Sequence, residues 1–324
     1  MKNIPILTLL ISLLSSPTHS RSYNEVKDVV FQAPRATLPD PDIPGIEPWA
    51  VLNALIRHAG AIVGRSDATF KDTDDFREGT PKLLHPRGVC TEGVWNITES
   101  SPATGLFSKG TKVPAIVRFS SGTADSEYLP KGAGRILGLA VKVFPTIDKS
   151  KDVITENIQM LDSYGFERSN RKRFFHDDDG TPVTFTNVAP AKSILGKVLS
   201  KFFDRFDKPN HVRPVYPMAE VNTSGEYNRD NSRAPYEITF KAAFPMSSQF
   251  SSDFRNDIMN LPNKQKLALD IFIVTMEPES KDGDLIPVNK KIGQLLLGDR
   301  VISDGCDYTL HFNHIFNDKD KVNR

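Results

Sequence analysis

The stretch from residue 89 to residue 144 constrains the fold most strongly, because its texture is that of short β-strands. Residues 113–119 and 137–144 are runs rich in branched side chains, and residues 93–98 are predicted to form an earlier strand. Glycine- and serine-containing stretches separate these runs, and no regular alternation of strand and helix accompanies them. The pattern predicts an α+β fold built on a mostly antiparallel sheet or barrel.

Further helices and strands are predicted along the rest of the chain. Residues 51–63 and 194–206 repeat apolar side chains at helical spacing. Residues 236–244 and 266–276 alternate apolar and polar side chains as strands do, and residues 307–312 are a last short candidate strand. Since 39% of the 324 residues are hydrophobic, the chain is large enough to bury a substantial core.

Two N-terminal segments precede the predicted domain. Residues 1–20 combine Lys2, a short apolar run and small residues before a cleavage point, which is typical of a secretory signal peptide. The apolar run is shorter than the ~20 residues that a membrane-spanning helix needs. Residues 21–47 are rich in proline, which favours an extended arm. We expect one folded domain over residues 48–324, in a secreted or periplasmic protein with no membrane span.

Export would place the two cysteines, Cys90 and Cys306, in an oxidising compartment. One long-range disulfide and two buried free thiols both fit the sequence. Two tripeptides, beginning at Asn96 and Asn222, match the N-glycosylation pattern, which matters only in a eukaryotic host. The state of the cysteines and of these asparagines stays open at this point.

The charge balance and the missing motifs exclude several classes of function. The 41 Lys and Arg residues against 40 Asp and Glu leave a net charge of +1, which provides no basic field for nucleic-acid binding. Motifs for phosphate loops, dinucleotide binding, zinc proteases, hydrolase elbows and redox cysteine pairs do not occur in the sequence. The acidic run at residues 176–180 lacks the later glutamate of a calcium loop, so a solvated turn is predicted there.

One constellation of residues is specific. H-P-R-G at residues 85–88 opens the β-rich region, L-F-S-K-G-T-K-V-P-A-I-V-R-F-S-S follows at residues 106–121, and G-L-A-V-K-V-F at residues 138–144. These blocks resemble the haem catalase family, whose core reads H-A-K-G, then L-F-S-K-G-T-x-V-P-x-x-V-R-F-S, then R-G-x-A-V-K-F. The resemblance covers most of residues 48–316. It implies the catalase fold, an antiparallel β-barrel with flanking helices, and haem b as the cofactor.

The resemblance also implies roles for particular side chains. His85 corresponds to the distal histidine, which takes a proton from one peroxide oxygen and returns it to the other. Ser120 corresponds to the serine whose hydroxyl holds the imidazole tautomer. Arg118 corresponds to a residue that pairs with a haem propionate. Lys82 stands where the family has a second propionate-binding arginine, so the charge is kept without the bidentate fork.

The distal asparagine of the family has two candidate counterparts within residues 155–162. Asn157 and Asp162 can each fill the position, and the sequence does not decide between them. An ionised aspartate beside peroxide would accept but not donate hydrogen bonds, which would weaken peroxide chemistry. We therefore count Asn157 with His85 and Ser120 as the predicted catalytic set.

The proximal side of the implied haem site departs from the family. Family haem iron is held by a tyrosinate in an R-x-x-x-Y helix, where the arginine lowers the phenol pKa. None of the seven tyrosines in this chain has an arginine four residues earlier. The sequence therefore identifies no axial ligand, and the metal-binding residues stay unknown.

Two classes of function follow from the resemblance. The first is an exported, haem-dependent oxidoreductase of catalase or peroxidase type, active in oxidative stress, whose small-molecule partner is hydrogen peroxide or an organic hydroperoxide. The second is a catalase-fold protein that has lost haem and serves a non-enzymatic binding or structural role. Conversion of fatty-acid hydroperoxides is a further alternative within the enzyme class. The oligomeric state stays open, a homo-oligomer included.

Overall fold

The computed structural model describes about half of the chain. The described residues are 23–33, 85, 87–121, 137–145, 156–162, 173–187, 220–221, 227–228, 235, 237–249, 251–262, 267–278, 285–310 and 312. Outside them lie the predicted signal peptide, the predicted helices at 51–63 and 194–206, Lys82, Asn222 and the prolines of the arm.

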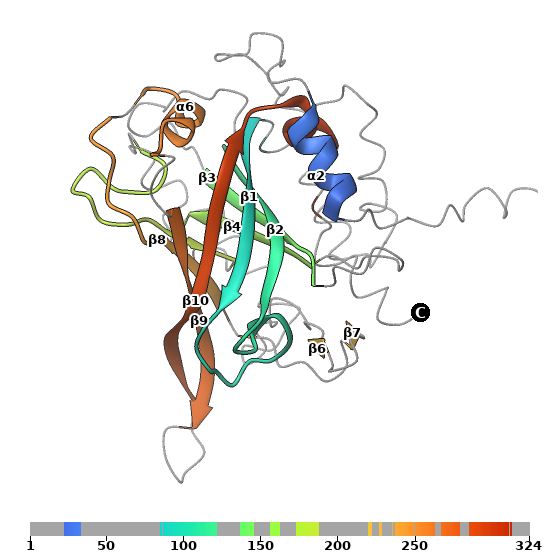
Figure 1. Ribbon diagram of the computed structural model, residues 1–324. Helices are drawn as coiled ribbons and strands as arrows, with labels where there is room; N and C mark the ends of the chain where they lie inside the picture. Colours follow the sequence, from blue (N-terminus) through green and yellow to red (C-terminus); the bar gives the residue numbers. More distant parts are fainter. Residues whose placement is uncertain are drawn as a thin grey trace, which may run out of the picture.

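Eight antiparallel strands form a closed barrel, which confirms the expected antiparallel β-barrel (Figure 1). Around the barrel the order is β1-β10-β9-β8-β5-β4-β3-β2. The strands are β1 (Arg87–Ile97), β2 (Lys112–Ser121), β3 (Leu137–Val143), β4 (Glu156–Asp162), β5 (Thr184–Thr186), β8 (Glu237–Ala242), β9 (Leu267–Pro278) and β10 (Leu285–Val301). A separate two-stranded sheet pairs β6 (Glu220–Val221) with β7 (Tyr227–Asn228). The expected strands at 113–119 and 137–144 are β2 and β3.

Apolar side chains fill the inside of the barrel. Alternate residues of each strand point to one face, so Val117 and Phe119 of β2 join the core while Arg118 and Ser120 face outward. Trp95 of β1 is fully buried, and its indole N–H donates to the Leu106 carbonyl over 2.7 Å. That carbonyl belongs to a short 3-10 turn, η2 (Gly105–Phe107). The core therefore fixes which face of each strand is available for a site.

The outer wall of β1 and β2 is covered by both ends of the described chain (Figure 1). Helix α2 (Tyr23–Gln32) lies beside a π-helical turn, η4 (Gly305–Thr309), which directly follows β10. Ser303 Oγ donates to the Val30 carbonyl over 2.6 Å, and any side chain at Gly305 would collide with the backbone of Val29. A disulfide between Cys90 of β1 and Cys306 of η4 settles the alternative that the sequence left open. Helix α2, turn η4 and the barrel wall therefore form one packed unit.

Several elements differ from the sequence-based expectation. Helix α2 occupies the start of the arm at 21–47, before its prolines begin at residue 34. The prediction of a strand at 307–312 is wrong, because residues 307–309 belong to turn η4. Strand β10 is the longest at 17 residues and was not anticipated, since its lysines and glycines interrupt the apolar alternation.

Two smaller expectations can be compared with the structure. Residues 176–180 form the expected turn, in which the Gly180 N–H donates to the Asp177 carbonyl over 3.0 Å. Helix α6 (Phe254–Met259) flanks the barrel and is capped by Asp253, whose carboxylate accepts from the Arg255 N–H. No helix within the described ranges is long and apolar enough to cross a membrane.

Candidate active site

The candidate site lies on the outer wall of the barrel, where four strands are aligned in register. Gly88 of β1, Ser120 of β2, Gly138 of β3 and Leu161 of β4 are successive partners across these strands. His85 precedes β1 and lies against this row. The pairing places the predicted histidine and serine side by side, although 35 residues separate them in the sequence.

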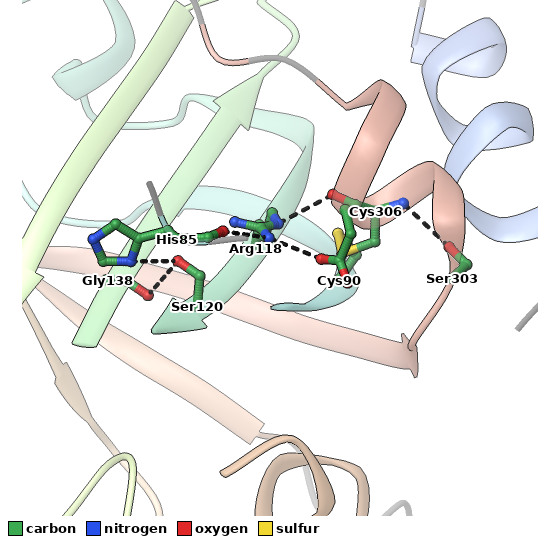
Figure 2. Close-up of polar contacts among 8 residues, drawn as sticks. His85, Cys90, Arg118, Ser120, Gly138, Ser303 and Cys306 are labelled. Carbon is green, nitrogen blue, oxygen red and sulfur yellow. Dashed lines mark hydrogen bonds and ion pairs between the residues drawn. A yellow bond between two sulfur atoms is a disulfide. The ribbon is translucent and has the colours of Figure 1, made fainter. Parts of the chain in front are cut away.

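The imidazole of His85 is held from two sides (Figure 2). Its Nδ1 atom lies 3.1 Å from Ser120 Oγ, within hydrogen-bonding distance. A side chain at Gly138 would place its Cβ 2.7 Å from Cε1 and 2.8 Å from Nδ1 of the same ring. Only glycine at position 138 therefore leaves room for the ring where it lies. Gly138 was not among the predicted site residues, although a glycine within a strand often marks such a close approach.

The backbone of His85 is strained and is held by Arg118. Its φ angle is 56°, in the left-handed region that non-glycine residues rarely adopt. Arg118 Nη2 donates to the His85 carbonyl over 2.8 Å. Strained residues of this kind persist only when their surroundings over-determine them, and they cluster at functional sites. The observed strain is therefore consistent with a functional role for His85.

Arg118 is tied to turn η4 by two further contacts (Figure 2). Its Nε donates to the Cys306 carbonyl over 3.1 Å, and its Nη2 forms a buried ion pair with Asp307 Oδ1 at 2.8 Å. A Cβ at Gly88 would lie 2.7 Å from Arg118 Nε, so glycine at that position lets the guanidinium rest on β1. Both hydrogens of Nη2 are therefore engaged, and the charge of Arg118 is balanced by Asp307.

The environment keeps His85 neutral near pH 7. Burial, followed by the positive charge of Arg118, lowers the pKa of His85 to about 4, while a hydrogen bond with the Ser120 backbone acts in the opposite direction. Ser120 Oγ also lies 3.5 Å from the Gly138 carbonyl. A hydroxyl that donates to this carbonyl can accept a hydrogen bond from Nδ1–H, and Nε2 is then left as an acceptor.

Asn157 and Asp162 occupy different faces of β4. Asp162 is buried, and its Oδ2 accepts from the Leu137 N–H over 3.3 Å. Asn157 shares the outer face with Ser120 and is fully buried, with no hydrogen-bond partner for its amide among the described residues. Four residues separate Asn157 from Leu161, which places it ~13 Å along the strand from the row beside His85.

A segment of the chain crosses the outer wall between these two positions. Arg118, Ala140 and Gln159 form the row between those of Ser120 and Asn157. Cys306 contacts one end of this row through Arg118, and the Phe312 carbonyl accepts from Gln159 Nε2 over 3.2 Å at the other end. The structure thus brings His85, Ser120 and Arg118 together and leaves Asn157 apart from them. The catalytic role of Asn157 stays a prediction.

Arg118 does not fit the role of a bidentate partner for a haem propionate. Either bidentate edge of a guanidinium includes Nη2, and both hydrogens of Arg118 Nη2 are already donated, so no edge is available for a propionate. Asp307, which takes the place expected for a propionate, was missed because it lies 189 residues from Arg118 and carries no local signal.

Substitution of Gly138 tests the close approach of the ring. In a Gly138→Ala variant the new methyl group should push the His85 imidazole away and break its contact with Ser120 Oγ, at a stability cost of about 1–3 kcal/mol. NMR of the histidine ring would detect the shift. Gly298→Ala is the matched control, because its nearest contact is 3.3 Å, to Glu92 Cβ, away from the site. An unmoved His85 signal in Gly138→Ala would contradict the geometry.

Two catalase structures are among the solved structures similar to this chain. No protein-family model and no curated protein matches the chain. A crystal structure of a fungal catalase is similar with a TM-score of 0.37 and 11% identity, over 72% of this chain and 52% of that one. A structure of a bacterial catalase is similar with a TM-score of 0.39 and 14% identity, over 86% of this chain and 61% of that one. The chain therefore spans about half to three fifths of the length of these catalases.

These likenesses are too weak to define a family. The chain's own features place it in the class of closed antiparallel β-barrel proteins, with a histidine–serine pair on the outer wall of the barrel.

Proposed function

We propose that this chain is a catalase-related protein in which His85 and Ser120 receive hydrogen peroxide or an organic hydroperoxide and move a proton at it. The observation that carries the proposal is a neutral imidazole, desolvated by its surroundings, whose Nδ1 lies within hydrogen-bonding distance of Ser120 Oγ. When Nδ1–H donates to Ser120 Oγ, Nε2 is the ring nitrogen left to accept a hydrogen bond from a peroxide hydroxyl.

The environment of His85 favours rapid release of any proton that the ring accepts. When Nε2 takes the proton from one peroxide oxygen, the resulting imidazolium is destabilised by burial and by Arg118. The proton then passes to the other oxygen, and the imidazole returns to its neutral state. Ser120 keeps the ring in the orientation that both transfers need. Cleavage of the O–O bond requires electrons from another group, and we assign that step to none of these residues.

Export belongs to the same proposal. It rests on the signal-peptide pattern of residues 1–20, and the disulfide between Cys90 and Cys306 supports it, since disulfides persist mainly in oxidising compartments.

Replacement of His85 tests the proposed function directly. We expect a His85→Gln variant, made with haem supplied during expression, to lose peroxide turnover by about 10²- to 10⁴-fold, the usual contribution of a general acid–base group. The rate of peroxide loss is the measurement. His176→Gln is the matched control, because His176 is also buried but binds the Phe244 carbonyl through Nε2. Equal turnover by His85→Gln and the wild type would remove His85 from the mechanism.

A second candidate is a barrel protein that binds a small molecule without catalysis. One observation favours it: the arginine expected to bind a haem propionate is instead paired with Asp307. The visible spectrum of the purified protein separates the two candidates. A stoichiometric Soret band supports the haem-dependent enzyme, and its absence, together with no peroxide turnover, supports the binding protein.

A further inference from the structure

We propose that turn η4 is a positioning element of the candidate site, in which Asp307 and Cys306 hold Arg118 so that Arg118 fixes His85. The inference deepens the proposed function, because it says what keeps the imidazole in place. It assigns Asp307 and Arg118 as positioning residues, since neither touches the Nε2 atom that would receive substrate. It also replaces the role that the sequence suggested for Arg118.

The contacts form a continuous chain from the turn to the histidine. Arg118 Nη2 shares its two hydrogens between the His85 carbonyl and Asp307 Oδ1, each at 2.8 Å, and Nε reaches the Cys306 carbonyl at 3.1 Å. The partners of this single guanidinium lie 33, 188 and 189 residues away in the sequence. A change in its placement therefore reaches His85 directly.

Arg118 cannot hold this position without the turn. Its side chain is buried, and a buried guanidinium needs a counter-charge and hydrogen-bond acceptors to stay out of water. Asp307 supplies the charge and Cys306 supplies a carbonyl. Without them, the guanidinium should turn toward solvent and release the His85 carbonyl.

The turn itself is rigidly attached. Cys306 is bonded to Cys90 on the barrel, and the Cys306 N–H donates to Ser303 Oγ over 3.2 Å. Ser303 in turn donates to the Val30 carbonyl of helix α2. The turn is thereby fixed to the barrel on one side and to helix α2 on the other. Asp307 thus approaches Arg118 from a fixed direction.

The strain at His85 explains why such support is needed. A φ of 56° is unfavourable for histidine, so the residue should relax when the contact with its carbonyl is lost. Relaxation of the backbone would carry the ring away from Ser120 Oγ and from the surface of Gly138. We therefore expect the position of the ring to depend on Asp307, even though Asp307 does not contact the ring.

The pKa of His85 in an Asp307→Asn variant distinguishes positioning from simple electrostatics. Arg118 is the described charged group whose field acts on His85. If Asp307 acted only through charge, its removal would leave the field of Arg118 unbalanced and lower the pKa of His85 below about 4. If Asp307 positions the ring, the released imidazole becomes more hydrated, and its pKa rises toward the ordinary value of 6.5. The two explanations therefore predict opposite signs.

NMR titration of the isotope-labelled full chain measures this shift without reference to turnover. Asp270→Asn is the control. Asp270 is likewise in an ion pair, with Lys291 at 2.7 Å, but it lies on β9. We expect the pKa of His85 to rise in Asp307→Asn and to stay unchanged in Asp270→Asn. A fall or no change in Asp307→Asn would overturn the proposal.

A second variant keeps the test decisive if Asp307→Asn does not fold. The double variant Arg118→Met/Asp307→Leu replaces the buried pair by apolar side chains, which folded proteins often tolerate well. We expect its His85 ring signals to lose the signature of the Ser120 hydrogen bond. An intact signature would overturn the proposal.

The two proposals can fail separately. If the His85 ring moves in the variants but the wild type shows no peroxide turnover, the proposed function is wrong and the positioning role is supported. Turnover that is lost in His85→Gln but unchanged in Asp307→Asn, with an unmoved ring, removes the positioning role alone.

Discussion

Removal of the disulfide through Cys90→Ala and Cys306→Ala is expected to lower the free energy of unfolding by about 5 kcal/mol, because the bond closes a very long loop. The two half-cystines are separated by 216 residues, and the chain entropy that a crosslink removes from the unfolded state increases with loop length. Alanine is the suitable replacement, since both residues are fully buried and serine would bury a hydroxyl. Unfolding in guanidinium chloride, followed by circular dichroism, measures the difference.

The single variant Cys90→Ala serves as the comparison for this result. It breaks the same bond, so it should lose nearly as much stability as the double variant. Wild-type protein unfolded in the presence of a dithiol reductant should show the same loss. A double variant with the unfolding midpoint and slope of the oxidised wild type would contradict the expected contribution of the crosslink.

Local patterns were sufficient to predict part of the barrel. The branched runs at 113–119 and 137–144 became β2 (Lys112–Ser121) and β3 (Leu137–Val143) with small changes at their ends. These strands are buried on the core side, where branched and aromatic residues are needed, so composition and structure agree. Strand β10 escaped prediction because residues 289–291 are polar and Gly293 and Gly298 interrupt the run.

The end of the described chain could not be predicted from its pattern. Leu310 and Phe312 alternate with polar residues as a strand would, but both pack against the outer wall after turn η4. The turn is held by a bond to Cys90 and an ion pair with Arg118, both about 200 residues away. Tertiary contacts of this kind override a short alternation of two or three residues.

The sequence was sufficient to identify residues of the candidate site but not the contacts between them. The resemblance singled out His85, Ser120 and Arg118, and the strand register brings all three together. It also proposed that Arg118 binds an anionic cofactor group, whereas Asp307 of the same chain is its partner. A propionate and the Asp307 carboxylate would each balance the positive charge of Arg118. The sequence therefore contains no local signal that distinguishes these two partners.

Acidification from pH 6.5 to below pH 4 is expected to cost about 3 kcal/mol of folding free energy through His85 alone. Its pKa is about 4 in the folded protein and about 6.5 when the chain is unfolded, so the unfolded state binds the proton more readily. The stability is therefore fully present above pH 6.5 and falls as the pH drops toward 4. Chemical unfolding of the wild type at several pH values gives the profile.

The His85→Gln variant isolates this contribution. Carboxylates titrate over the same range in both proteins, so their effects cancel in the difference between the two profiles. The variant should lose about 3 kcal/mol less than the wild type between pH 6.5 and pH 4. His176→Gln is the control, because burial also lowers the pKa of His176, yet its replacement leaves the His85 step in place. If His85→Gln and the wild type lost the same free energy over this range, the ring of His85 would be hydrated in the folded protein. It could not then be the neutral imidazole that the proposed proton transfer requires.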